Sequence, residues 1–204
     1  EIQANMALAE IYTHLSENAR ILLGRLPVYT SAVPVEGLIK LGLDLPDDPE
    51  ALLGRLQSLS LVEAQYEPRW DAIQYQCSPL LAAWLREKNL SDETPRWLEA
   101  AADYQVYLQR YERRSLSQAM LAHAALRRAN RKTEADRLAL DSIVGPLNRA
   151  GFYRTILRDW LPDICQSDDP TIRGEALGQT GKQYFDTGDY ETALAYLQKS
   201  LAIQ

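Results

Sequence analysis

The chain has 204 residues, of which 46% are hydrophobic, and a formal net charge of -6. This composition favours a folded chain of one or two domains over a disordered one. The acidic balance disfavours nucleic-acid binding, which usually relies on a basic patch.

No apolar run approaches the roughly 18 residues that a membrane-spanning helix needs, and the N-terminus lacks the order of regions that marks a signal peptide. Cys77 and Cys165 are far apart and have no metal-ligand spacing. We therefore expect a cytoplasmic protein that holds no metal or other cofactor and does not bind a membrane.

The first part of the chain, up to about Asn89, is punctuated by prolines. Residues 1–15 are interpreted as the end of a preceding helical segment. After them the pattern predicts helices at 16–26, 34–42 and 49–59, strands at 61–66 and 72–77, and a helix at 78–88. Three helices followed by a hairpin predict a winged-helix domain over residues 16–92.

The second part, from Pro95 onward, consists almost entirely of helix formers with long 3.6-residue periodicity. It predicts six helices, at 95–112, 115–129, 132–149, 152–166, 171–187 and 190–204. Antiparallel helix pairs joined by short turns are typical of an α-solenoid. We place the domain boundary in the polar stretch that ends at Pro95.

The stretch from Gly178 to Lys182 has the residue types of a phosphate-binding loop but not the spacing. Such a loop needs four residues between its glycines and a Ser or Thr after the lysine, and it follows a strand. Here the glycines are two residues closer, Gln183 follows the lysine, and the preceding residues look helical. The sequence therefore predicts that the chain is not an enzyme and has no catalytic residues.

The same stretch is similar to a tetratricopeptide repeat, a unit of about 34 residues. With Gly174 as the first position, the large, small and aromatic positions of the repeat fall on Leu177, Gly181, Tyr184, Gly188, Tyr190, Ala193 and Leu197. Gly151 and Tyr153 match Gly188 and Tyr190 one unit earlier. The expected fold is mostly α: a winged-helix domain with a small β hairpin, then an α-α superhelix of tetratricopeptide-like helix pairs over 95–204 that continues beyond the chain end.

The repeat register also predicts a partner-binding surface. In such arrays the first helix of each pair lines the concave groove, which implies that Glu175, Gln179, Lys182, Phe185 and Asp186 face a protein or peptide ligand. Phe185 is either an apolar anchor for that ligand or packs under a following helix.

The first part, from Leu15 through Val62, resembles the winged-helix segment of STAND proteins, the signal-transduction ATPases with numerous domains. The resemblance implies a non-catalytic regulatory and recognition region. Its winged helix would contact the ATPase domain of the same chain, and its repeats would bind a partner. The family often places a histidine that contacts the bound diphosphate just after the hairpin. Ser78 stands at that position here.

Two alternatives stay open: a stand-alone tetratricopeptide scaffold, and a winged-helix transcription regulator with a repeat effector domain. Residues 49–59 offer only Arg55 and Gln57 for reading base edges, which disfavours the second. One basic cluster, residues 110–114 with residues 127–132, is either a solvated set of helix ends or a patch for an acidic partner.

Overall fold

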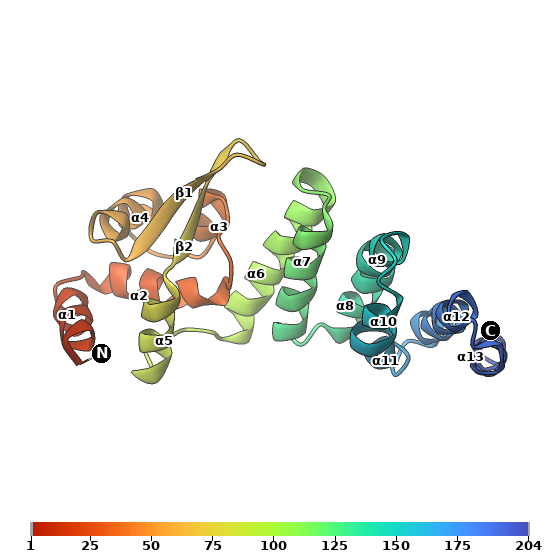
Figure 1. Cartoon of the computed structure of the whole chain (residues 1–204). Coiled ribbons are helices and arrows are strands. Elements are labelled where there is room, and N and C mark those ends of the chain that lie inside the picture. Colours follow the sequence, from red (N-terminus) through yellow and green to blue (C-terminus); the bar gives the residue numbers. More distant parts are fainter. Residues whose placement is uncertain (1, 204) are drawn as a thin grey trace. The chain divides into compact units, whose positions relative to one another are not determined.

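The computed structural model describes the backbone of residues 2–203 and the side chains of residues 6–203. It divides into two compact units, Glu1–Tyr104 and Gln105–Gln204. Within the described residues the sheet is a two-stranded antiparallel hairpin, and helices form most of the remainder (Figure 1). The predicted mostly α fold with a small β hairpin is therefore confirmed.

The first unit contains the three helices and the hairpin that the sequence predicts. Its elements are α1 (Ile2–Thr13), α2 (Glu17–Arg25), a short 3-10 helix (Leu26–Val28), α3 (Val35–Lys40), α4 (Pro49–Ser58), β1 (Val62–Glu67), β2 (Ala72–Cys77), α5 (Pro79–Glu87) and most of α6 (Pro95–Tyr107). The 3-10 helix is not apparent in the sequence pattern.

Side chains cap three of these helices. The Ser16 hydroxyl accepts a hydrogen bond from the backbone N–H of Ala19, and the Ser78 hydroxyl accepts one from the N–H of Leu81. Asp48 caps α4 in the same way. These bonds satisfy N–H groups that have no partner inside the helix, which explains where the helices begin.

The hairpin pairs β1 with β2 from Val62 opposite Cys77 to Glu67 opposite Ala72. Val33, in the loop before α3, forms an additional antiparallel bridge with Tyr75. Their backbone groups exchange hydrogen bonds of 2.9 and 2.7 Å. This bridge ties the hairpin to the helices of its own unit.

The core of the first unit is made of leucines from several elements. Leu22, Leu23, Leu26, Leu38, Leu41, Leu56 and Leu85 are all almost completely buried. Arg25 is buried beside them. Its guanidinium donates to the backbone oxygen of Leu41 at 2.7 Å and to the carboxylate of Asp44 at 2.6 Å.

Helix α6 begins inside the first unit. The Arg25 guanidinium lies 4.0 Å from the centre of the Trp97 ring. Gly37 faces Tyr104 so closely that a Cβ atom on it would stand 2.5 Å from the Tyr104 ring. The division between the compact units therefore lies within α6, after Tyr104, whereas the predicted boundary marks the loop that precedes this helix.

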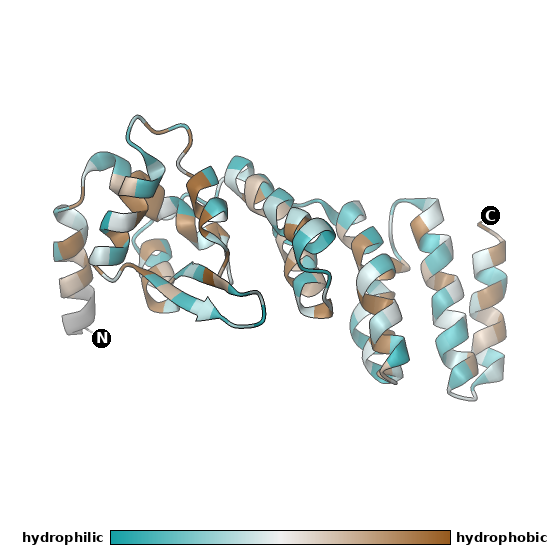
Figure 2. Cartoon of the chain, turned by 90° about the horizontal axis from the view of Figure 1, so that it is seen from above, coloured by the Kyte–Doolittle hydropathy of each residue, from teal (hydrophilic) through white to brown (hydrophobic). Residues whose placement is uncertain are grey.

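The described helices from α6 onward correspond to the six predicted helices, taken in chain order as three pairs, and all but the first part of α6 belong to the second unit. After the end of α6 and a π-helical segment (Leu108–Glu112), its elements are α7 (Leu116–Arg128), α8 (Lys132–Ala139), a π-helical segment (Leu140–Val144), α9 (Gly145–Arg149), α10 (Tyr153–Thr155), a π-helical segment (Ile156–Trp160), α11 (Leu161–Ile164), α12 (Pro170–Asp186) and α13 (Tyr190–Leu201). Hydrophobic and hydrophilic residues are mixed along these helices (Figure 2), as expected of amphipathic helices that bury one side.

The turns inside the second and third pairs use glycine in the same way. Gly151 has a φ of 79° and Gly188 has a φ of 86°. This left-handed conformation is disfavoured for residues with a Cβ atom. The predicted equivalence of these two glycines is thus confirmed in the backbone.

Two of the π-helical segments have an identifiable cause. Pro146 and Pro162 lack a backbone N–H, and their rings crowd the carbonyl four residues earlier, at Ser142 and Arg158 respectively. Both carbonyls lie inside a π-helical segment. The wider turn relieves the crowding, since helices commonly distort at proline.

Candidate functional site

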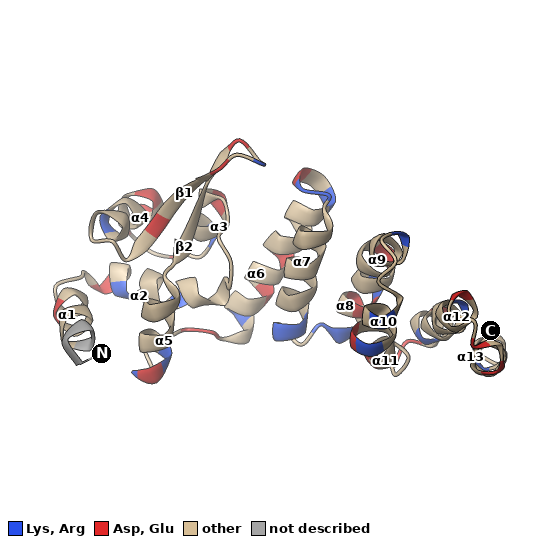
Figure 3. Cartoon of the chain, viewed as in Figure 1, with Lys and Arg blue, Asp and Glu red and all other residues tan. Residues whose placement is uncertain are grey.

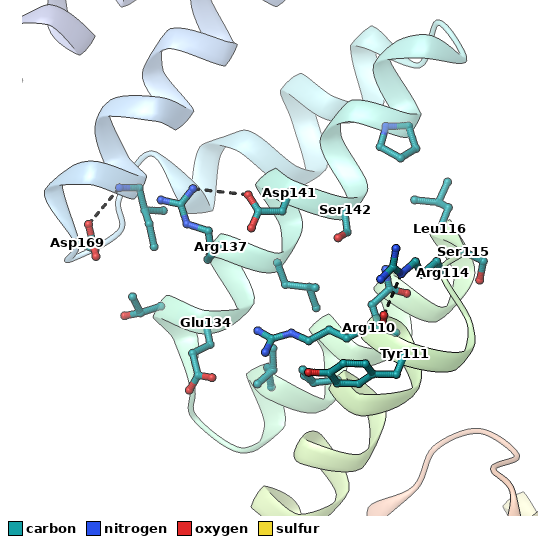
Figure 4. Close-up of a pocket in the computed structure, with 17 residues that line it drawn as sticks. Arg110, Tyr111, Arg114, Ser115, Leu116, Glu134, Arg137, Asp141, Ser142 and Asp169 are labelled. Atoms are coloured by element: carbon teal, nitrogen blue, oxygen red, sulfur yellow. Dashed lines mark hydrogen bonds and ion pairs between the residues drawn. The ribbon is translucent and has the colours of Figure 1, made fainter.

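A groove of about 860 Å³ lies within the second unit. It is lined by the end of α6 and the π-helical segment after it, by both ends of α7, by the stretch from α8 to α9, and by the start of α12 (Figure 4). Its lining residues are Val106, Gln109, Arg110, Tyr111, Arg114, Ser115, Leu116, Leu126, Thr133, Glu134, Arg137, Leu138, Asp141, Ser142, Pro146, Asp169 and Ile172. Two π-helical segments supply part of this lining, and such segments are frequent at functional sites.

The acidic side chains of the groove already have partners. Arg131 donates two hydrogen bonds to the Glu134 carboxylate, at 2.6 and 2.7 Å, which lowers the pKa of Glu134. Asp169 caps α12 by accepting from the backbone N–H of Thr171 at 2.8 Å. Both carboxylates therefore have a structural role.

Arg137 is held between two carboxylates. It lies 2.6 Å from Glu175 on α12 and 3.7 Å from Asp141 on its own helical stretch. The hydrogen bond to Glu175 is the main reason why the pKa of Arg137 is raised. This contact joins the second helix pair to the third.

Arg110 and Arg114 differ from Arg137 in that neither forms an ion pair with any residue that the structure describes. The Nε atom of Arg114 donates to the backbone oxygen of Arg110 at 2.9 Å. The Arg110 side chain extends across the groove toward Glu134 (Figure 4), and its charge contributes to lowering the Glu134 pKa. Two positive charges thus lie at one end of the groove.

The basic residues of the predicted cluster have different environments in the structure. Basic residues lie in the connection between α6 and α7 and at the end of α7 (blue in Figure 3). Arg113 is buried, and Arg127 lies 3.7 Å from Asp136 and 3.5 Å from Asp163. Of the cluster, only Arg110 and Arg114 line the groove.

An aromatic side chain and a buried amide lie next to these arginines in sequence. Tyr111 is 72% exposed, and its ring centre is 5.5 Å from that of Tyr107. Gln109 is only 8% exposed, and its Oε1 atom accepts no hydrogen bond from the described residues. A buried acceptor without a partner is costly, so this atom is a candidate for binding a donor from a ligand.

The five predicted partner-binding residues lie on α12 beyond the groove. Glu175 contacts the groove indirectly, through Arg137. Gln179 is half-buried, and Lys182 and Asp186 are exposed. Phe185 is 58% exposed and makes an edge-to-face contact with Tyr190 at 5.3 Å. Their role in binding stays a prediction.

The structure also shows the surroundings of three further residues that the sequence analysis considered: Lys182, Cys77 and Ser78. Lys182 lies inside α12, where the backbone N–H groups serve the helix and form no phosphate cradle. Burial raises the pKa of the Cys77 thiol to about 12, so it is a poor nucleophile. Ser78 caps α5, which accounts for its hydroxyl without a nucleotide. No group of three metal-binding side chains occurs among the residues that the structure describes.

A search of solved structures finds a crystal structure from Pyrococcus horikoshii: a signal transduction ATPase with numerous domains (STAND) with a tetratricopeptide repeat sensor. The TM-score is 0.57, the sequence identity is 16%, and the match covers 98% of this chain. The fold is similar to that of a STAND protein. The expected resemblance is therefore confirmed at the level of the fold.

The match spans about a third of the solved chain, 33% of its length. No protein-family model and no curated protein matches the sequence. Among the described residues, no helix has both the length and the apolar character needed to cross a membrane.

Proposed function

We propose that the chain is the regulatory and protein-recognition region of a STAND-type ATPase. The observation that carries this proposal is the order of elements. A helical unit with a hairpin precedes an array of helix pairs, and this order resembles that of a STAND protein over 98% of the chain. The repeats bind a protein or peptide, and the hairpin unit acts as a winged helix that contacts the ATPase domain of the same polypeptide.

The groove supports the recognition role of the repeats. Most of its lining residues come from the first helices of the pairs, the surface at which tetratricopeptide arrays are expected to hold a ligand. Its volume of about 860 Å³ falls within the range of ligand pockets. The chain's histidines and cysteines form no catalytic arrangement, so the proposed region does not itself perform chemistry.

The test uses the full-length gene product. We expect it to contain a phosphate-binding loop and to change its rate of ATP hydrolysis when a peptide occupies the groove. A full-length product without such a loop would contradict the STAND assignment but leave recognition by the repeats standing. Unchanged hydrolysis with the groove occupied would contradict the regulatory role.

The role of Ser78 requires a separate comparison in the full-length product. Ser78→Ala removes a helix cap, and Ser16→Ala removes a cap of the same kind in the same unit. If Ser78 also contacts nucleotide, Ser78→Ala weakens diphosphate binding more than Ser16→Ala does. Equal effects of the two variants would assign Ser78 to capping alone.

A further inference from the structure

The groove is asymmetric in charge. At one end Arg137 is matched by Glu175 and Asp141. At the other end Arg110 and Arg114 lie four residues apart in the chain, and neither forms an ion pair with a described residue. The nearest groove carboxylate, that of Glu134, already takes two hydrogen bonds from Arg131.

We propose that this end of the groove binds an acidic peptide segment, whose carboxylates are held by Arg110 and Arg114. This inference rests on the proposed function, in which the repeats recognise a protein. Guanidinium groups bind carboxylates with paired, charge-assisted hydrogen bonds, which are stronger than neutral ones. A carboxylate from a ligand therefore gives Arg110 and Arg114 the paired hydrogen bonds that no described carboxylate of the chain gives them.

The bond between Arg114 and the Arg110 backbone helps to position the site. Nε of Arg114 donates a hydrogen bond to that oxygen at 2.9 Å. This bond restricts the side chain, while the two terminal guanidinium nitrogens stay available to a ligand. The Arg110 side chain extends toward Glu134 (Figure 4). The tethered Arg114 donors lose less freedom on binding than mobile surface side chains do.

Gln109 and Tyr111 favour a peptide over a free anion. The unpartnered Oε1 of Gln109 needs a donor, and a turn about the last side-chain torsion, which is soft, can present it to the groove. A peptide backbone offers N–H donors, whereas a carboxylate ion offers none. The exposed Tyr111 ring provides apolar contact for a side chain next to the acidic one.

The experiment is a display selection of random-sequence peptides on the whole chain. We expect the selected peptides to be enriched in Asp and Glu. A selected peptide is then labelled, and its affinity is measured by fluorescence anisotropy together with a version in which each acidic residue becomes its amide. We expect the amide version, and the Arg110→Gln and Arg114→Gln variants, each to bind about tenfold more weakly or worse.

Arg154→Gln is the matched control, because Arg154 is exposed in the same unit but does not line the groove. It is expected to leave the affinity unchanged. Selected peptides without acidic residues, or acidic peptides that bind Arg110→Gln and Arg114→Gln as well as Arg154→Gln, would overturn the inference and leave the proposed function intact. Failure to select any peptide would overturn both. Displacement of the peptide by inorganic phosphate at equal concentration would overturn the preference for a peptide.

Discussion

Gly181 on α12 lies against Ala193 on α13 so closely that a Cβ atom on Gly181 would stand 3.0 Å from the backbone oxygen of Ala193. The same atom would be 2.8 Å from the side chain of Leu197. This is the close crossing that the repeat register predicts for these positions. The backbone oxygen cannot move aside without shifting a helix.

Gly181→Ala is therefore expected to destabilise the chain by up to about 2 kcal/mol. Overpacking costs about 1–3 kcal/mol, and the gain in helix propensity offsets about 1 kcal/mol. Gly54→Ala is the control, since Gly54 lies in α4 with open space around its Cβ position, and it is expected to stabilise slightly. Urea unfolding measures both, and equal effects would contradict the close crossing.

Ala193→Leu tests the other side of the contact. Ala193 is 2% exposed, so the larger side chain is expected to cost about 1–3 kcal/mol of unfolding free energy. Ala195→Leu places the same side chain at an exposed position of the same helix and should change little. An unchanged thermal unfolding midpoint in Ala193→Leu would show that the repeat register is wrong.

The chain is expected neither to bind nor to hydrolyse ATP. The motivation is the position of Lys182 inside the regular helix α12, where the backbone N–H groups are used by the helix and form no phosphate cradle. Isothermal titration calorimetry with ATP and magnesium is the measurement. Micromolar binding that Lys182→Ala abolishes would refute the expectation.

Asp136 predicts a pH dependence of stability. It is 1% exposed, and burial raises its pKa above the ordinary 3.8, outweighing the Ser167 hydroxyl and the nearby positive charges, which lower it. The folded chain thus binds this proton more tightly than the unfolded chain. The contribution of Asp136 is present below pH 3.8 and is lost as the pH rises through the raised pKa.

Asp136→Asn is expected to be more stable than the wild type at neutral pH, because the cost of burying the charge is removed. The difference should shrink as the pH falls toward the ordinary pKa. Asp168→Asn, at an exposed position, is the control and should show no such trend. Urea unfolding across this pH range provides the comparison. A less stable Asp136→Asn at neutral pH would show that Arg127, 3.7 Å away, outweighs burial.

Phe185 tests the predicted binding surface of the third pair. In a chain that carries at least one more repeat, Phe185→Ala should weaken peptide binding and leave the unfolding midpoint nearly unchanged, because Phe185 is 58% exposed. Tyr190→Ala removes the ring that contacts Phe185. It therefore shows whether a loss of affinity comes from losing this contact or from losing the Phe185 side chain itself. A large loss of stability with unaltered affinity would assign Phe185 to packing.

The sequence predicted the helices of the second unit closely because their ends carry strong local signals. Gly151 and Gly188 adopt the conformations that turns require, and Asp169 and Ser115 cap the helices that follow them. Propensity, capping and periodicity act over a few residues, so a single sequence reveals them.

The groove could not be predicted in the same way. The ion pair between Arg137 and Glu175 joins residues 38 positions apart, and no periodicity relates them. The basic run around Arg110 was visible, but only the fold shows that Arg113 is buried whereas Arg114 reaches the groove. Prolines at 146 and 162 were a readable signal for the π-helical segments, which the sequence interpretation missed.

Hydrogen exchange of the whole chain with and without a selected acidic peptide tests whether the groove of the repeats recognises a ligand. We expect slower exchange in residues 106–116 and 133–146, which contain most of the groove lining, and no change in the hairpin, Val62–Cys77. Protection of the hairpin with unchanged exchange along the groove would contradict recognition by the groove.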